Sequence, residues 1–116
     1  MKTAFLIATL LFFCVGAWAQ TPYDLADGKD LQALCQAQTK DASLNALAHT
    51  FCLGYMRGVA ESAGLIKSDH ACAPKGVSDE DLKKIVMRYV ESNPKSLRQR
   101  PTVLIPAAVQ AAFHCK

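Results

Sequence analysis

The sequence predicts an all-α fold: a small four-helix bundle stapled by two disulfides. Apolar residues recur every three or four positions in several segments, which is the period of an α-helix. No segment shows the apolar–polar alternation of a strand followed by a hairpin turn. Residues 20–116 contain four cysteines, an even number, which indicates disulfides when a chain is exported.

Residues 1–19 have the layout of a secretory signal peptide. Lys2 precedes an apolar run over residues 4–15, and Ala17-Trp18-Ala19 forms an A-x-A cleavage site. We expect cleavage before Gln20, which leaves residues 20–116 as one domain. The apolar run is too short for a membrane span, and no other stretch approaches the ~20 apolar residues that a span needs.

The charge of the chain is nearly balanced. The formal net charge is +3, and removal of residues 1–19 takes away one lysine. No basic run is interleaved with aromatic residues, so the sequence does not predict a nucleic-acid surface.

The first two predicted helices are antiparallel neighbours. The first covers residues 31–39, with Asp30 as its N-cap, and a short connection leads to a central helix over residues 42–67 that Asp41 caps. The apolar rhythm predicts that one face of the central helix is buried. Its residues are Leu44, Leu47, Ala48, Phe51, Tyr55, Val59 and Ile66.

The central helix also carries a second stripe, of small residues one turn apart: Gly54, Gly58 and Ser62. A glycine inside a helix costs about 1 kcal/mol relative to alanine, so two of them indicate a packing reason. We expect close approach of another helix backbone. The same spacing occurs in membrane helices, but His49, Arg57 and Glu61 argue against that interpretation.

The third helix is the clearest in the sequence. Ser78 is its predicted N-cap and Asn93-Pro94 ends it. Its apolar residues lie at helical spacing: Leu82, Ile85, Val86, Tyr89 and Val90. Residues 95–100 are polar and expected in solvent, and a fourth helix is predicted over residues 102–113 with Pro106 inside it.

The four cysteines allow three disulfide connectivities, and their spacing alone does not choose among them. In an up-down-up-down bundle, the end of the central helix and the end of the fourth helix share one pole. That topology favours the pairs Cys35–Cys52 and Cys72–Cys115.

No catalytic residue, metal site or cofactor is predicted. Ser68, Asp69 and His70 are neighbours in one loop, whereas catalytic triads take their geometry from distant segments. The chain has no close C-x-x-C pair and its histidines are scattered, which argues against zinc. His49 is interpreted as a hydrogen-bonded structural histidine.

Five motifs occur in order along the chain. They are Phe51-Cys52-Leu53-Gly54-Tyr55, Gly58-Val59, Cys72-x-Pro74 with Gly76-Val77, Ile85-Val86-x-x-Tyr89-Val90 leading to Asn93-Pro94, and Ala111-Ala112-Phe113-His114-Cys115. In this order they resemble the Rap/Tai family, the immunity proteins against type VI secretion amidases of Gram-negative bacteria. The resemblance covers residues 34–115.

The resemblance implies a periplasmic all-α protein, a homodimer in many members, that binds a peptidoglycan-cleaving amidase effector and blocks its active site. An inter-helix loop of such proteins plugs the cleft of the enzyme, and residues 67–76 match that loop in position. It therefore implies a partner contact at four residues: Ser68, Asp69, His70 and Lys75. The alternative function is a small periplasmic stress or chaperone-type protein, which would also be small, helical and disulfide-bonded.

Overall fold

The protein is described by a computed structural model that covers residues 25–68 and 71–115. The predicted signal peptide and two of the predicted contact residues, Asp69 and His70, lie outside the described residues. Within the described part, the chain forms four α-helices and one short 3-10 helix, and no strand. In chain order these are α2 (Gly28–Cys35), α3 (Ala42–Ser62), α4 (Asp79–Ser92), η2 (Pro94–Arg98) and α5 (Pro101–Phe113). The all-α prediction is confirmed.

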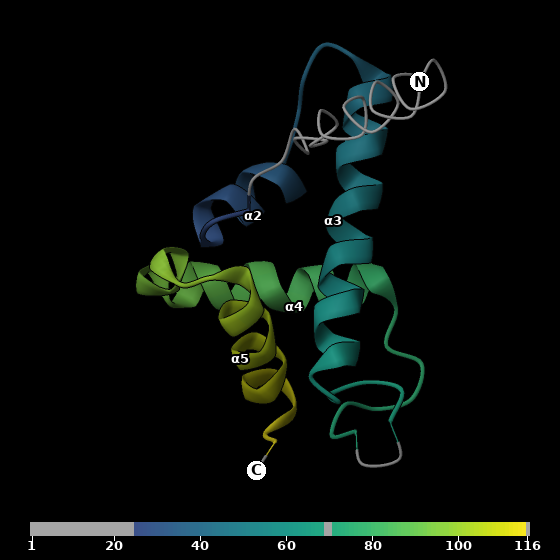
Figure 1. The fold of residues 1–116 in the computed structure, drawn as a ribbon, viewed down its shortest axis with the longest axis vertical. Helices are drawn as coiled ribbons and strands as arrows, with labels where there is room; N and C mark the ends of the chain where they lie inside the picture. The colour runs from purple at the N-terminus through teal and green to yellow at the C-terminus, as the bar shows by residue number, and fades with distance from the viewer. Residues whose placement is uncertain (1–24, 69–70, 116) are drawn as a thin grey trace, which may run out of the picture.

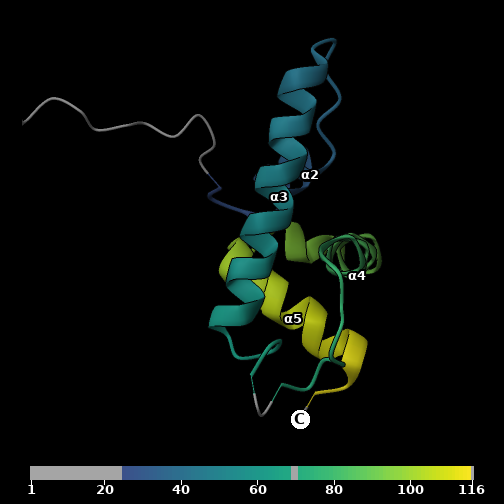
Figure 2. The ribbon, with the colours of Figure 1, turned by 90° about the vertical axis from the view of Figure 1, so that its right-hand side faces the viewer.

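The longest helix, α3, is the element on which the others pack. It contacts α2, α4 and α5, and α4 also packs on α5. Figures 1 and 2 show that α4 lies across α3 instead of running alongside it. The up-down-up-down arrangement is therefore wrong for this pair, because a long loop joins α3 to α4 and only short connections require antiparallel neighbours.

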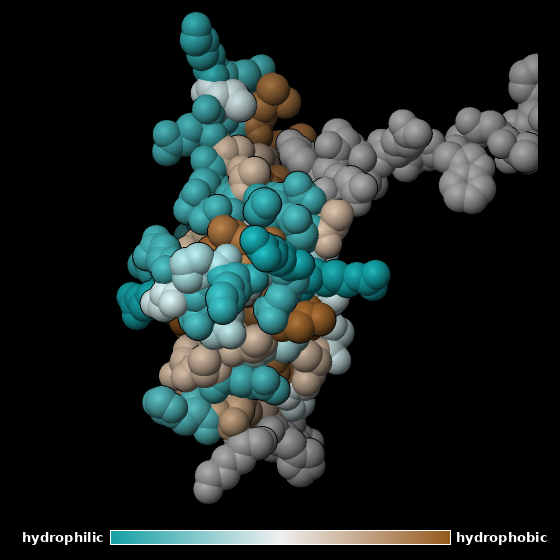
Figure 3. All heavy atoms as spheres, turned by 90° about the vertical axis from the view of Figure 1, so that its left-hand side faces the viewer, coloured by the Kyte–Doolittle hydropathy of each residue, from teal (hydrophilic) through white to brown (hydrophobic). Residues whose placement is uncertain are grey.

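The core lies where these helices meet. Its fully buried side chains come from every α-helix: Leu31, Met56, Leu82, Val86, Val90, Leu104, Ile105 and Val109 are among them. Hydrophilic residues cover most of the face drawn in Figure 3, with apolar residues in small groups between them. On that face the pattern is that of a small domain whose apolar residues are mostly inside.

Helix α2 begins and ends earlier than predicted. Asp27, not Asp30, is the N-cap, and its carboxylate accepts hydrogen bonds from the backbone N–H groups of Lys29 and Asp30. The Asp30 carboxylate accepts in turn from the Asp27 N–H, at 3.3 Å, which completes a capping box. Asp27 and Asp30 thus form the capping box together. Asp30, the predicted N-cap, is the third residue of α2.

Gly28 lies at a close approach between α2 and η2. Its N–H donates to the Gln99 carbonyl at 2.9 Å. A Cβ at this position would lie 2.9 Å from the Leu97 Cα and 3.0 Å from the Ser96 carbonyl oxygen. Both are backbone atoms that cannot rotate away, so only glycine fits here without a shift of η2.

Gly28→Ala is expected to lower the free energy of unfolding by about 1–3 kcal/mol, because the added methyl overpacks the contact with η2. Urea denaturation measures the change. Lys29→Ala is the matched control, since Lys29 is exposed in the same turn, and it should change stability by less than about 0.5 kcal/mol. Equal stability of Gly28→Ala and the parent protein would show that η2 moves freely against α2.

The predicted caps of the next two helices are confirmed. The Asp41 carboxylate accepts from the Ser43 and Leu44 N–H groups, and the Ser78 hydroxyl accepts from the Asp81 N–H. In α4 the predicted apolar face is also confirmed, with Leu82, Val86 and Val90 buried. Helix α3 ends earlier than predicted, at Ser62.

The predicted buried face of the central helix is correct only in part. Ala48 and Ile66 are buried, and Tyr55 and Val59 are partly buried against the core, but the other predicted members lie outside. The buried residues of this helix are Ala48, Cys52, Met56 and Ala60. Leu44, Leu47 and Phe51, which were expected inside, have 50%, 57% and 38% of their surface exposed. The disulfide explains the difference, because Cys52 must face α2 to pair with Cys35 and so lies on the buried face.

The expected close approach at the glycines of α3 is absent within the described chain. Gly54 and Gly58 are exposed, and a Cβ at either position would meet nothing within 4 Å. The packing reason inferred for these two glycines is therefore not found among residues 25–68 and 71–115.

Both predicted disulfides are confirmed. Cys35 and Cys52 join α2 to α3 across a Cα–Cα distance of 5.2 Å, and Cys72 and Cys115 join the loop after α3 to the end of α5 across 5.6 Å. The first pair is buried, whereas Cys72 is exposed and Cys115 is partly exposed. One bridge is thus part of the core, and the other holds a surface loop.

Candidate partner-binding site

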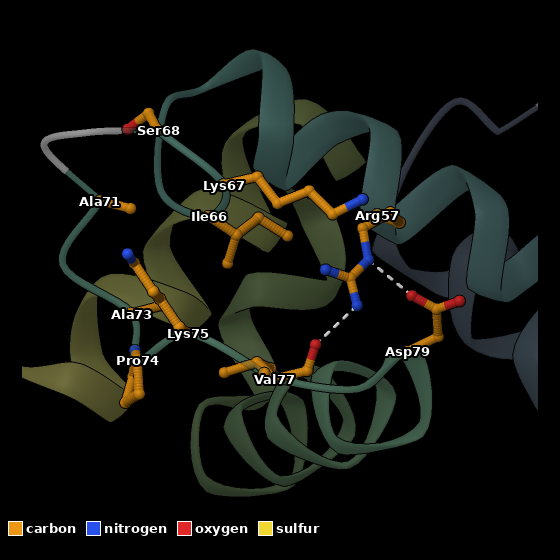
Figure 4. A pocket seen from close by; sticks show the side chains of 11 residues that line it. Arg57, Ile66, Lys67, Ser68, Ala71, Ala73, Pro74, Lys75, Val77 and Asp79 are labelled. Atoms are coloured by element: carbon orange, nitrogen blue, oxygen red, sulfur yellow. Dashed lines mark hydrogen bonds and ion pairs between the residues drawn. The ribbon is translucent and has the colours of Figure 1, made fainter.

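An open pocket of about 900 Å³ lies where the end of α3, the loop after it and the start of α4 meet (Figure 4). Its lining residues come from these three elements: Arg57, Ile66, Lys67, Ser68, Ala71, Ala73, Pro74, Lys75, Gly76, Val77 and Asp79. The pocket therefore occupies the part of the chain in which the resemblance places the partner contact.

The loop is shaped by backbone turns and by its apolar residues. Gly64, which follows the C-cap of α3, is in the left-handed conformation, with φ 71°, which glycine adopts without strain. Leu65 and Ile66 then enter the core, and the Ala73 N–H donates to the Leu65 carbonyl at 3.3 Å. With Cys72 bonded to Cys115, these contacts hold both ends of the loop against the helices.

Arg57 connects the three walls of the pocket. From α3, its Nε donates to the Asp79 carboxylate at 2.5 Å and its Nη2 donates to the Val77 carbonyl at 2.7 Å. Asp79 is the first residue of α4, so one guanidinium fixes both the end of the loop and the start of that helix. The side chain of Arg57 is only 20% exposed, which strengthens these charged contacts relative to those of a surface pair.

The rim of the pocket is mainly cationic. Arg57, Lys67 and Lys75 line it, with Asp79 as the only acid among the lining residues described. Lys67 also pairs with Glu61, at 3.2 Å, and Figure 4 shows Lys75 pointing into the space enclosed by the loop. Because Arg57 pairs with Asp79 and Lys67 pairs with Glu61, an acidic group of a ligand or partner would be bound mainly by Lys75.

Two of the four predicted contact residues, Ser68 and Lys75, line this pocket. The Ser68 hydroxyl donates to the Gly64 carbonyl at 2.9 Å, so it also stabilises the turn after α3. The structure therefore brings Ser68 and Lys75 together at one pocket.

Sequence reasoning missed the part played by Arg57 and Asp79. In the sequence, Asp79 is accounted for as an acid in the first turn of the helix that Ser78 caps, which leaves no reason to look for a cation. Glu61, four residues after Arg57, was an available intrahelical partner, but it pairs with Lys67. No local signal in the sequence indicates that Arg57 reaches across the loop.

Arg57→Ala is expected to lower the free energy of unfolding by about 1–2 kcal/mol, because the Val77 carbonyl and the Asp79 carboxylate lose a charged donor. Urea denaturation followed by circular dichroism measures it. Arg88→Ala removes an exposed arginine of α4 and should change stability by less than about 0.5 kcal/mol. If the two variants were equally stable, Arg57 would contribute no more than an ordinary surface charge.

A second pocket, of about 840 Å³, lies between α2, α3 and α4. His49 lines it, and its Nε2 is 2.7 Å from the Glu80 carboxylate while its Nδ1 is 3.4 Å from the Lys83 ammonium. The expectation of a hydrogen-bonded histidine is confirmed, and the contacts join α3 to α4. On the same helix, burial raises the pKa of the Tyr55 hydroxyl above its ordinary value.

Neither pocket contains a recognisable catalytic constellation. Over residues 25–68 and 71–115, no group of three His, Cys, Asp or Glu residues could hold a metal ion. All four cysteines in these ranges are in disulfides, which leaves no thiol nucleophile there. In the same part of the chain, no helix is both long and apolar enough to cross a membrane.

The fold and the paired cysteines define a class of protein: a small helical module, cross-linked twice, with a loop pocket at one end. The family model described as Rap1a immunity proteins matches residues 27–115, and the chain belongs to this family. The match confirms the resemblance and implies that the protein binds a toxin effector. No curated protein matches the chain, and no solved structure does.

Proposed function

We propose that this protein is a periplasmic immunity protein that binds and inhibits a peptidoglycan amidase delivered by type VI secretion. It protects the producing cell and its kin from that enzyme. The observation that carries the proposal is membership of the Rap1a immunity family over residues 27–115.

The two disulfides support the periplasm as the compartment. Disulfides form and persist in oxidising compartments, of which the bacterial periplasm is one. The signal-peptide layout of residues 1–19 agrees with export. An amidase that cleaves peptidoglycan acts in the same compartment, so an exported inhibitor meets its target there.

The loop pocket is the proposed contact with the effector. Lys75 and Ser68 line it, and Asp69 and His70 follow Ser68 in the same loop. The cationic rim suits an acidic group beside the cleft of the enzyme. Arg57 fixes the backbone at Val77 and the Cys72–Cys115 bridge fixes the loop at Cys72, so these two points lose little conformational freedom on binding. In this proposal the protein acts by binding, without catalysis of its own.

We also propose that the protein forms a homodimer, as the family resemblance implies. The exposed apolar residues of α3 support this part of the proposal, since apolar groups on the surface of a small domain mark interaction sites.

A pull-down tests the proposed function. The exported protein, oxidised, is exposed to the secreted and periplasmic proteins of the native cell. Recovery of one peptidoglycan amidase at a fixed ratio supports the immunity function. Recovery of many unrelated proteins, increasing after acidification, would instead favour a chaperone-type protein whose binding surface includes the exposed apolar residues of α3.

A further inference from the structure

The charges of the chain are unevenly distributed along the sequence. Nine of its 10 acids come before residue 82, whereas six of its 13 cations lie between residues 83 and 100. Glu91 is the only acid in that second segment. The near-balance of the whole chain therefore coexists with a cationic segment, which consists of most of α4, all of η2 and the two residues before α5.

Five cations of this segment form a surface that we call the cationic ridge: Lys84, Arg88, Lys95, Arg98 and Arg100. All five are exposed. Over residues 25–68 and 71–115, none of them belongs to an ion pair, because the three pairs found there use other cations. Three of the five are arginines, whose planar guanidinium groups match the geometry of phosphate. The ridge therefore presents unneutralised charge to solvent or to a partner.

Helical spacing places the cations on the outer sides of their elements. Lys84 and Arg88 are four residues apart on α4, on the side away from its buried residues. Side chains three residues apart lie on one side of a 3-10 helix, and Lys95 and Arg98 have this spacing in η2. Ser96, between them, is buried. Helix η2 thus packs through Ser96 and turns its two cations outward.

Most of the ridge lies at the end of α4 away from the loop pocket. Asp79 lines that pocket at the start of α4, whereas η2 follows the other end of the helix. Figure 1 shows the loop joined to the right end of α4 and η2 at its left end, and Figure 3, which views the molecule from that left side, shows hydrophilic side chains gathered there. A partner on the ridge would therefore leave the pocket accessible to the effector.

The placement of the cations favours an extended anionic surface as the partner. Neither of the two pockets described above includes a residue of the ridge. The five cations project from the surface instead of lining either of these cavities. This arrangement suits many anionic groups in one plane better than a single small anion, which needs converging donors.

An exposed apolar residue lies beside the ridge. Val103 is 53% exposed, and its N–H donates to the Arg100 carbonyl at 2.9 Å, so the two residues share the first turn of α5. At the surface of a bilayer, an apolar side chain among cations can enter the boundary between headgroups and acyl chains. The carboxylates of the cell wall would bind the cations but would leave the valine in water. The combination of cations and valine therefore favours a phospholipid surface.

We propose that the protein attaches reversibly to anionic phospholipid membranes through the cationic ridge, with Val103 in the headgroup region. Each lysine or arginine near an anionic lipid surface strengthens such binding, so five of them can hold a small protein there without a membrane-spanning helix. The attachment would concentrate the protein at a membrane that bounds the periplasm and leave the loop pocket facing away from the lipid. The inference goes beyond the proposed function and rests only on its compartment.

Sedimentation with lipid vesicles tests the ridge. The exported, oxidised protein should bind vesicles of phosphatidylcholine with phosphatidylglycerol at least ~10-fold more tightly than phosphatidylcholine alone, and salt should release it. Lys95→Glu should weaken binding to the mixed vesicles ~10-fold or more, because a repelled charge replaces an attracted one. Lys40→Glu is the matched control: Lys40 is an exposed lysine before α3, and its substitution should change binding less than ~3-fold.

A tryptophan at position 103 reports contact with lipid directly. Residues 20–116 contain no tryptophan, so Val103→Trp adds a single fluorescent reporter to the exported chain. Its emission should shift to shorter wavelength on the mixed vesicles. Leu44→Trp is the control: Leu44, near the start of α3, is 50% exposed against 53% for Val103, and its emission should not shift. Equal shifts at the two positions would overturn the assignment of the membrane face.

Four other results would overturn the proposal. They are no binding to the mixed vesicles at low salt, equal binding by Lys95→Glu and Lys40→Glu, binding to purified peptidoglycan in place of vesicles, and loss of amidase inhibition by Lys95→Glu with normal vesicle binding. The third would assign the ridge to cell-wall carboxylates, and the fourth would assign it to the effector.

The outcome is separate from that of the immunity function. Lys95→Glu should keep the helicity of the parent protein and should still inhibit the amidase, so that its defect is confined to lipid. A parent protein that inhibits an amidase and binds no vesicle would remove the membrane contact and leave the immunity function in place. Vesicle binding by a protein that inhibits no amidase would do the reverse.

Discussion

Alanine at both Cys35 and Cys52 is expected to lower the free energy of unfolding by about 3 kcal/mol. The bridge joins two residues with a sequence separation of 17 and so restricts the conformations of the unfolded chain. Its loss raises the conformational entropy of the unfolded state and thereby favours unfolding. Both cysteines are also buried, and Cys52 determines which face of α3 is inside. Equilibrium urea denaturation of the double variant measures the loss. A change below about 1 kcal/mol would show that α2 is held by its packing and not by the bridge.

The two disulfides of the molecule should differ in how easily a reductant reaches them. Cys72 is exposed, so a dithiol reductant should reach the Cys72–Cys115 bridge in the folded protein, while Cys35–Cys52 stays protected until the core opens. Alkylation after mild reduction, read by mass spectrometry, should therefore label Cys72 and Cys115 first. Simultaneous labelling of all four cysteines would contradict the assignment of one core bridge and one surface bridge.

Lys75→Glu is expected to weaken binding of the effector at least ~10-fold, because the pocket would exchange a cation for an anion facing an acidic partner. Titration calorimetry with the purified amidase measures the dissociation constant. Lys40→Glu is the matched control, since Lys40 is an exposed lysine just before α3, at the end of that helix away from the pocket. This control variant should bind as the parent protein does.

Circular dichroism should show equal helicity for both lysine variants, which separates a binding defect from a folding defect. Asp69→Lys should also weaken binding, because the resemblance places Asp69 itself against the effector and the substitution removes that contact. If Lys75→Glu and Asp69→Lys both bind normally, the loop is not the contact. The segment over residues 95–100, which contains exposed cations in and after η2, would then be the next candidate.

Local chemistry explains which parts of the fold could be predicted. Asp41 and Ser78 cap helices because a short oxygen-bearing side chain at that position satisfies free N–H groups nearby in sequence. Likewise, the face of α4 follows from one clear apolar stripe with charged residues opposite it. These features depend on residues within a few positions of one another.

The orientation of α3 could not be predicted because both of its faces are apolar. Its buried face consists of Ala48, Cys52, Met56 and Ala60, while larger apolar side chains lie outside. Counting apolar residues selects a face that includes Leu44, Leu47 and Phe51, whereas the bond from Cys52 to Cys35 turns the buried face toward Cys52. The disulfide pairing was predicted correctly even though α4 lies across α3, because the loop after α3 still reaches the end of α5.

The place of the partner contact stays a prediction, and the structure adds a pocket whose construction the sequence did not predict. The resemblance placed residues 67–76 at the contact, and Ser68 and Lys75 share one pocket. The residue that fixes the walls of that pocket, Arg57, is 22 positions from Asp79 in sequence. A contact at this separation is a product of tertiary packing and leaves no periodic or motif signal.

The most direct test of the central claim is an assay of peptidoglycan hydrolysis by the amidase recovered with this protein. Purified amidase is titrated with the oxidised, exported protein, and soluble fragments are measured. Our account predicts that activity falls linearly to zero at a fixed molar ratio and that Lys75→Glu shifts or abolishes the endpoint. Full amidase activity in the presence of excess protein would contradict the account, as would release of fragments by the protein alone.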